Sequence, residues 1–476
     1  MIVKQLGIFS IFFLFSVLYS CTNEEYTISS SDYLVFSKDT IKMDTVFSNI
    51  PTSTKDIWVY NKNNKNIKLT SVKLDRGNQS GFRVNIDGIY LGPNTGYQTN
   101  EVDIPANDSI RVFVELNAVN NGLNTPQKIE DNLSFILESG IRQNVNLNAY
   151  SWDATILNNV TINKDVTLNA DKPIVVYGSL KVDSLSTLII NPGTTLYLRD
   201  EASINVYGRL FCKGDAQNRV VLRGYRLDNM FDYLPYDRVS GQWGGVHFFE
   251  SSYGNEIHYT DLHSAFTGID IDSSSINFRK LLLENSSIHN CQGYGINNHN
   301  SNIEINNCQI SNSYKDCLYT DGGIVRINNS TIAQFYPFNV DRGQALNFTS
   351  ASGDLKFYCS NTIITGYADD EIIGKQNDTI SVFDYEFSDC ILRTPKVLTS
   401  DSVRFKNVIF ESPEDTITSG KKNFINIDIK NLIYDFRLDS LSPAIDKANP
   451  ITSVPTDHDG LLRDEKPDIG AFERKK

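Results

Sequence analysis

The sequence lacks a surplus of basic residues. Its 476 residues include 44 Lys and Arg against 57 Asp and Glu, a net charge of −13. A general nucleic-acid binder needs a basic stripe, so no nucleic-acid partner is expected. The sequence also has no apolar run of bilayer-spanning length, while hydrophobic residues still make up 40% of it. This composition excludes both a polytopic membrane protein and a disordered chain.

The usual short catalytic signatures are also missing. The chain has no Gly-rich phosphate loop, no His-Glu-x-x-His and no Gly-x-Ser-x-Gly. Apart from Cys21, its cysteines form no CxxC pair and no finger-like cluster with histidine, so no zinc site of this kind is predicted. We expect these to be buried free thiols, although an exported protein can also form disulfides: Cys212, Cys291, Cys308, Cys317, Cys359 and Cys390.

Asparagine and aromatic residues are abundant. There are 49 Asn, 23 Tyr and 26 Phe. Asn is unfavourable inside helices and favoured in turns, whereas aromatic and β-branched residues favour strands. The composition therefore predicts an all-β protein that is rich in turns.

The N-terminus has the pattern of an export signal. Lys4 precedes the short apolar run Ile8 to Val17, which is too short for a membrane span. Leu18-Tyr19-Ser20-Cys21 resembles the lipobox of bacterial lipoproteins, and the acidic residues after Cys21 resemble the surface-export signal of Bacteroidetes lipoproteins. The resemblance implies a signal peptide (1–20), lipidation of Cys21, a tether (21–31) and an outer-membrane protein anchored by lipid, facing the cell surface or the periplasm.

Residues 32–150 are predicted to form a β-sandwich. Seven short runs of alternating apolar and polar residues follow one another, separated by Asn, Gly and Pro. Their order resembles that of the immunoglobulin-like modules of bacterial surface proteins, although a Cys–Trp–Cys core is absent. We expect a spacer between the membrane and the next domain.

A repeat follows from 151 to 438. Units starting at Leu281, Ile303 and Val325 are offset by 22 residues. They place Asn285, Asn307 and Asn329 at one position and Ile288, Ile310 and Ile332 at another, and weaker copies put Asp389 and Asn407 at the Asn position. One such coil cannot cover its own apolar face, but stacked coils can. The Asn position suits a left-handed turn whose side-chain amides bond from coil to coil.

These units resemble the right-handed parallel β-helix family. The last residues, 439–476, carry Ser442 to Asp446, Asp457 to Arg463 and Asp468 to Glu473. These pieces resemble the closing motif of choice-of-anchor-type β-helix modules from Bacteroidetes. The resemblance implies a fold and a surface setting, not a reaction. The Asp457 to Gly460 stretch looks like a calcium loop, but its Gly comes fourth rather than sixth, which favours a structural role.

Two functions remain open. A non-catalytic, monomeric protein would bind a glycan or an envelope protein through the β-helix, with Tyr294, Tyr319 and Tyr336 as candidate contacts. Alternatively, a polysaccharide lyase or glycoside hydrolase would act on an acidic glycan. It would use Lys315 or Arg342 as cations, and Asp369, Asp370 and Glu371 as carboxylates that could hold calcium as the only expected cofactor.

Overall fold

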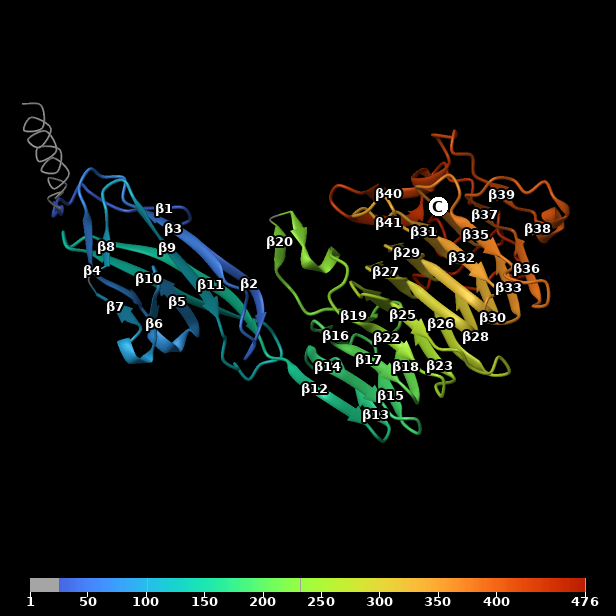
Figure 1. Cartoon of the computed structure of the whole chain (residues 1–476), viewed down its shortest axis with the longest axis horizontal. Helices are drawn as coiled ribbons and strands as arrows, with labels where there is room; N and C mark the ends of the chain where they lie inside the picture. Colours follow the sequence, from blue (N-terminus) through green and yellow to red (C-terminus); the bar gives the residue numbers. More distant parts are fainter. Residues whose placement is uncertain (1–24, 101, 232, 476) are drawn as a thin grey trace, which may run out of the picture. The chain divides into compact units, whose positions relative to one another are not determined.

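The computed structural model describes residues 25–100, 102–231 and 233–475 (Figure 1). The chain divides into two compact units after Asp153. The predicted signal peptide and the lipidated Cys21 lie outside the described residues. In the described part of the chain, no helix has the length and apolar character needed to cross a lipid bilayer.

The first unit is a β-sandwich, as predicted. Its inward-facing residues alternate with outward ones, as in β9, where Ile110, Val112 and Val114 are buried and Arg111 is exposed. One sheet contains, in spatial order, β1 (Val35–Phe36), β3 (Lys55–Tyr60), β9 (Ser109–Leu116), β5 (Phe82–Ile86) and β6 (Ile89–Leu91). The other contains β2 (Thr40–Phe47), β11 (Arg142–Trp152), β10 (Gln127–Leu137), β4 (Ile67–Leu74) and β7 (Gln98–Thr99), with β8 (Val102–Ile104) also on β4.

The sandwich ends two residues beyond the predicted boundary at 150, because β11 continues to Trp152. The short strands β6, β7 and β8 lie in a stretch rich in Gly, Pro and Asn that the sequence predicted as turns. The first and last long strands, β2 and β11, pair in parallel. The described residues also include five short 3-10 helices: η1 (Gly77–Gln79), η2 (Pro93–Thr95), η3 (Tyr236–Arg238), η4 (Ser400–Arg404) and η5 (Gly420–Asn423).

The second unit is a parallel β-helix with three faces. Strands of successive coils pair in parallel register along each face. Face A contains β17 (Ser203–Val206), β22 (Gly245–Phe248), β25 (Ile269–Ile271), the first halves of β28 (Ile296–Asn306) and β30 (Leu318–Asn328), β32 (Leu346–Thr349) and β35 (Ile372–Lys375).

Face B follows face A along each coil. It contains β13 (Val166–Leu168), β15 (Thr187–Ile190), β18 (Arg209–Lys213), β23 (Asn255–His258), β26 (Arg279–Glu284), the second halves of β28 and β30, β33 (Leu355–Ser360), β36 (Phe383–Ser388) and β38 (Phe405–Lys406).

Face C completes each coil. It contains β16 (Thr195–Leu198), β19 (Val220–Gly224), β24 (Thr260–His263), β27 (Ser287–Cys291), β29 (Gln309–Ser313), β31 (Thr331–Gln334), β34 (Ile363–Gly366), β37 (Ile391–Leu392) and β39 (Ile409–Phe410). At the N-terminal end, β12 (Thr155–Ile162) pairs with β14 (Ile174–Val182), and β14 continues into both face C and face A.

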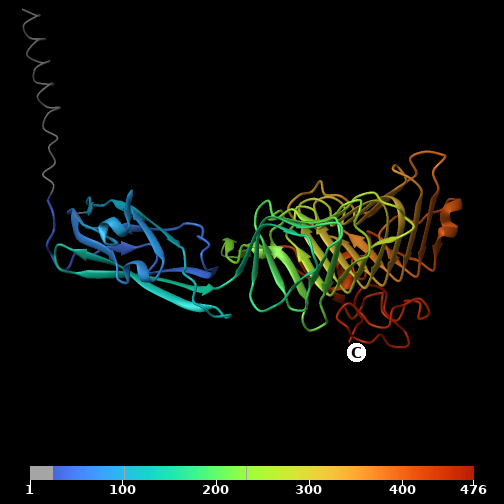
Figure 2. The same ribbon diagram turned by 90° about the horizontal axis from the view of Figure 1, so that it is seen from below.

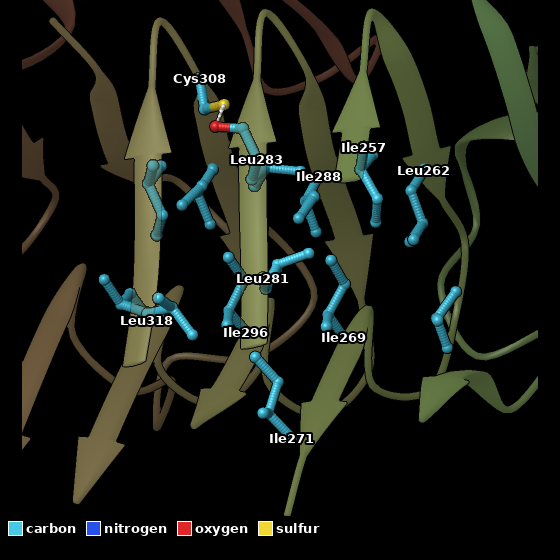
Figure 3. Packing of buried hydrophobic residues seen from close by; sticks show 14 of the residues in the cluster. Ile257, Leu262, Ile269, Ile271, Leu281, Leu283, Ile288, Ile296, Cys308 and Leu318 are labelled. Carbon is cyan, nitrogen blue, oxygen red and sulfur yellow. Dashed lines mark hydrogen bonds between the residues drawn. The ribbon is translucent and has the colours of Figure 1, made fainter. Parts of the chain in front are cut away.

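The 22-residue repeat is the register of the coils. Ile288 pairs with Ile310, and Ile310 with Ile332, and all three side chains are buried. Figure 3 shows the aliphatic side chains of neighbouring coils pointing into one shared core. Each coil thus covers the apolar surface of the next, as the sequence predicted.

The repeated asparagines have the predicted left-handed backbone, with φ between 43° and 51° at Asn285, Asn307 and Asn329. The prediction that their side-chain amides form hydrogen bonds from coil to coil is wrong for Asn285 and Asn307. Asn285 Nδ2 donates to the Asp457 carbonyl and Asn307 Nδ2 to the Thr456 carbonyl, each over 2.6 Å. The amide of Asn407, by contrast, does bond to the neighbouring coil, at Asp389. We call Asn285, Asn307 and Asn329 the Asn ladder; its side chains bind the C-terminal segment.

This closing segment (439–473) lies along face C (Figure 2). The strands of the helix end at Phe410, earlier than the predicted 438, and the antiparallel hairpin β40 (Phe424–Asp428) and β41 (Ile433–Leu438) follows outside the stack. Phe335 and Ile363 of the coils pack with Phe436 of the hairpin and Phe472 in one apolar cluster. The hairpin and the closing segment together cover an apolar part of face C.

The motif residues of the closing segment have structural roles. Arg463, whose side chain is 2% exposed, donates to the Asn307 amide oxygen and the Gly470 carbonyl and pairs with Glu473 at 3.1 Å. The Asp457 carboxylate accepts backbone N–H groups of Asp459, Leu461 and Glu473. A side chain at Gly470 (φ 105°) would lie 2.9 Å from Ile363 Cδ1. These contacts account for Arg, Asp and Gly at these positions.

We predict that Asn307→Gly loosens the closing segment. Glycine keeps the left-handed backbone but removes the amide bonds to Thr456 and Arg463, each of which contributes about 0.5–1.5 kcal/mol. Hydrogen exchange of the segment's amides, such as that of Ala471, should accelerate roughly 10-fold to 100-fold.

Asn300→Gly is the matched control. Asn300 also has positive φ (33°), but its amide bonds to Ser273 rather than to the closing segment. Equal exchange in the two variants would show that the Asn ladder does not hold the segment.

The six cysteines of the β-helix are buried free thiols, which confirms our first interpretation. Burial raises the pKa of the Cys212, Cys291 and Cys308 thiols to about 12. The Cys308 thiol also donates to the Leu283 carbonyl of the neighbouring coil over 3.4 Å (Figure 3).

We predict that these thiols do not react in the native protein. The reactive form is the thiolate, and burial keeps the thiols protonated. A chromogenic disulfide reagent should detect none of the six before unfolding and all six in denaturant. Thiols that titrate in the native protein would contradict their place in the core.

Candidate functional site

Two segments cover the outer surface of face C. The closing segment covers its C-terminal coils, where Ala471 N–H donates to Thr331 Oγ1 over 3.0 Å. The covering loop (225–244), which contains β20 (Asn229–Phe231) and β21 (Leu234–Pro235), covers earlier coils, and Ser264 of face C donates to its Asp237 carbonyl over 3.0 Å. The candidate ligand surface is therefore face A and its corners.

Face A presents a row of polar side chains, one per coil. Asp270, Asn297, Tyr319 and Asn347 are register partners in successive coils, and each is half-buried. Asn297 Nδ2 donates to Asp270 Oδ1 over 2.8 Å. Since neighbouring strands are about 4.8 Å apart, the row places hydrogen-bonding groups at a fixed spacing along the helix.

At the corner between faces C and A, the structure brings three of the predicted residues together. The Lys315 ammonium lies 4.7 Å from the centre of the Tyr294 ring, and the rings of Tyr294 and Tyr319 are 5.4 Å apart. Lys315 N–H donates to the Gly293 carbonyl of the previous coil over 3.0 Å, which fixes the turn. We call Tyr294, Lys315 and Tyr319 the corner cluster.

Asp316, next to Lys315, holds the turn of the corner cluster in place. Asp316 accepts the Gln344 N–H over 2.9 Å and the Asn347 amide over 3.1 Å. Burial raises the pKa of the Asp316 carboxyl. Burial likewise raises the pKa of the Tyr294 and Tyr319 hydroxyls, so both stay neutral donors at neutral pH.

The corner between faces A and B carries a second aromatic group. An open cavity of about 500 Å³ is lined by Tyr207, Phe249, Glu250, Ser251, Tyr253 and Asp272. The Tyr207 and Phe249 rings stack at 4.0 Å, as do Phe249 and His247, and His247 Nε2 lies 2.9 Å from Asp272 Oδ1. His247 also pairs in register with Asp270, so the polar row reaches this cavity.

The other predicted residues make their contacts outside the corner cluster. Arg342 packs 4.5 Å over the Tyr367 ring and donates to the Asn339 carbonyl. Tyr336 is buried with its hydroxyl 3.0 Å from Ser240 Oγ, because the covering loop packs against it. This burial removes Tyr336 from the candidate surface.

The three neighbouring carboxylates do not converge. Asp369 is 83% exposed and 4.0 Å from Arg393, while Asp370 accepts the Ile372 N–H over 3.2 Å. Glu371 is fully buried and accepts the N–H groups of Ala368 and Ala345. Among the described residues, these three carboxylates do not form a group of closely spaced metal-ligating side chains. Glu371 thus closes a turn inside the protein.

Sequence reasoning missed Asp270, Asn297, Asn347 and the aromatic cavity. The signal that could have found Asn297 is the 22-residue offset, since Tyr319 lies one repeat after it. The offsets to Asp270 and Asn347 are 27 and 28 residues, because these coils carry longer turns. Only the strand register resolves such positions.

No family model and no curated protein matches the chain. Among solved structures, one that is similar is a protein of unknown function from Porphyromonas gingivalis W83, 11% identical over 28% of this chain and 50% of that chain, with a TM-score of 0.19. Another is a family 123 glycoside hydrolase from Clostridium perfringens, studied for glycolipid glycan hydrolysis, 6% identical over 27% and 30%, with a TM-score of 0.18. The chain spans half or less of these neighbours, and likeness at this level carries no argument.

We predict that Glu371→Gln changes how stability depends on pH. Burial raises the pKa of the Glu371 carboxyl from 4.5 to about 8, against the opposing backbone N–H groups and Arg342. Between these values the folded state holds a proton that the unfolded state releases, so this group's contribution to stability falls as pH rises.

The measurement is the difference in melting temperature between Glu371→Gln and the natural chain from pH 4 to pH 9. The variant should gain relative stability as pH rises through this window, since Gln cannot ionise. A difference that does not change with pH would contradict the burial of an ionisable carboxyl at this position.

Proposed function

We propose that the chain is an envelope lipoprotein that binds a glycan across face A of its β-helix. The observation that carries the proposal is the polar row of face A, which aromatic groups flank at both corners. The rigid coils fix the spacing of donors and acceptors, and a sugar chain presents hydroxyls at regular intervals. Sites that bind ligands by stacking and hydrogen bonds combine these two kinds of side chain.

The anchoring part of the proposal depends on sequence alone. The lipobox-like Leu18 to Cys21 precedes the described residues, and the sandwich that begins near Val35 would serve as a spacer from the membrane. The partner in this proposal is a polysaccharide, and the acidic net charge of −13 favours a neutral one.

An enzymatic alternative depends on the same corner. Lys315 could neutralise a uronate carboxylate, and Tyr294 or Tyr319 could carry a proton, as a lyase requires. The raised pKa of both tyrosines disfavours their use as bases at neutral pH, since a base must first lose its proton. This difference makes binding the better-supported function.

We predict that Tyr294→Ala and Tyr319→Ala each weaken retention on a glycan array by about 10-fold, the effect of removing about 1.4 kcal/mol of a well-placed aromatic contact. Tyr358→Ala is the control, because Tyr358 lies on face B of the same β-helix and is more than a third exposed.

The same glycans are incubated with the protein and assayed for new reducing ends and unsaturated sugar products. Binding without products supports the proposal. Products that disappear in Lys315→Ala would replace it with the lyase, and retention unaffected by either tyrosine variant would exclude face A as the binding surface.

A further inference from the structure

A second polar cluster lies on face C, beneath the covering loop. Asp261 and His263 are two residues apart on β24, so both side chains point outward from the coil. His289 on β27 is the register partner of His263 in the next coil. The sheet therefore brings together two histidines that are 26 residues apart in the sequence.

The donor atoms of the three residues converge. Asp261 Oδ1 lies 3.0 Å from His263 Nδ1 and 2.9 Å from His289 Nε2. The two imidazole rings stack with centres 4.9 Å apart and an interplanar angle of 20°. All three potential ligand atoms lie within 4.8 Å of one another.

A further carboxylate orients His263 from the covering loop. Asp237 Oδ1 lies 2.9 Å from His263 Nε2, the nitrogen that points away from Asp261, and Arg223 holds the same oxygen at 2.7 Å. Histidines that bind metal donate their other N–H to such a carboxylate, which fixes the tautomer and the ring orientation. The His263 to Asp237 contact has this arrangement.

The surroundings of the cluster favour a positive charge. Asp237 and Asp261 carry two negative charges, and Arg223 offsets one. The side chain of His263 is 6% exposed, whereas those of Asp261 and His289 are 34% and 24% exposed, so one side of the cluster is accessible from solvent.

We propose that Asp261, His263 and His289 bind a zinc ion, with a fourth position open to solvent. Zinc binds nitrogen at about 2.0–2.1 Å and carboxylate oxygen at about 2.0–2.2 Å, so tetrahedral ligand atoms are roughly 3.3 Å apart. The two separations from Asp261 Oδ1, 3.0 and 2.9 Å, need to open by only a few tenths of an ångström, and the two histidine nitrogens lie within 4.8 Å of each other. Two imidazoles and one carboxylate also suit zinc better than calcium, which takes oxygen ligands.

The protons balance in the binding step. Without metal, each nitrogen of His263 faces a carboxylate oxygen, Nδ1 facing Asp261 and Nε2 facing Asp237, and His289 Nε2 also faces Asp261. Zinc replaces the Nδ1 proton, which leaves to solvent, while Nε2–H continues to donate to Asp237. His289 binds through Nε2, so the proton that this nitrogen directs at Asp261 without metal passes to solvent, and the neutral ring then carries its one proton on Nδ1. No oxidant or reductant is involved.

The test is equilibrium dialysis of the tag-free chain against Zn²⁺, with metal analysis of the protein. The natural chain should bind one zinc per chain, and His289→Ala should lose it. Asp237→Asn should keep the three ligands but bind about 10-fold to 100-fold more weakly, the usual effect of removing a carboxylate that orients a histidine ligand.

His258→Ala is the matched control. His258 lies on face B between Glu284 at 3.1 Å and Glu256 at 3.4 Å, a histidine among carboxylates without a second histidine. It should retain one zinc. Asp261→Asn serves as a second ligand variant whose partly exposed side chain lowers the risk of misfolding.

Two results would overturn the proposal: zinc binding that survives both His289→Ala and Asp261→Asn, or no stoichiometric zinc in the natural chain. Circular dichroism of each variant separates a lost site from a lost fold. The outcome is independent of the glycan proposal, because the cluster and the polar row lie on different faces.

Discussion

The stacking of coils in register is the constraint on which the rest of the structure depends. A single coil of three short strands exposes both its backbone edges and its apolar side chains, and neither is stable alone in water. Parallel pairing of the coils provides hydrogen-bond partners for the backbone edges and buries the apolar side chains. Ile288, Ile310 and Ile332, for example, pack in one column. Every outward side chain then also falls into a column, so the packing of the core determines the order of groups on each face.

The asparagine ladder shows how this constraint extends to the end of the chain. The tight turn between faces B and C has a left-handed residue in each of the coils of the 22-residue repeat, and Asn supplies it there at small cost. The same residue carries an amide, and the columns align these amides at an even spacing. The closing segment uses them together with Thr331 to dock on face C, where Phe335 and Ile363 would otherwise be exposed. A turn requirement has thus produced a binding surface for the chain's own terminus.

The features that depend on the periodicity were predicted from the sequence, whereas the contacts made by the inserted loops were not. The all-β class, the sandwich, the coils and the left-handed Asn positions follow from alternation and from the 22-residue offset, which are local signals. The covering loop breaks the period, so nothing in the sequence indicates that Asp237 reaches His263, or that Tyr336 is buried against Ser240. Glu371 was predicted to hold calcium together with Asp369 and Asp370, yet its carboxyl group turns inward and accepts backbone N–H groups. Whether a loop side chain points inward or outward depends on the turn geometry, which the spacing of residues in the sequence does not specify.

The same reasoning explains why the metal-ligating cluster was not predicted. Zinc sites are found in sequences by short spacings such as CxxC, which bring ligands together within one turn. In a β-helix, proximity comes instead from register, so His289 lies beside His263 because one coil separates them, and Asp261 lies beside both because strand residues alternate. Outward side chains of any type come together in this way when they occupy paired positions in adjacent coils. Sites in such folds must therefore be sought by comparing the outward-facing positions of adjacent coils. At this cluster, the covering loop contributes one further carboxylate, that of Asp237, to a pair of aligned histidines.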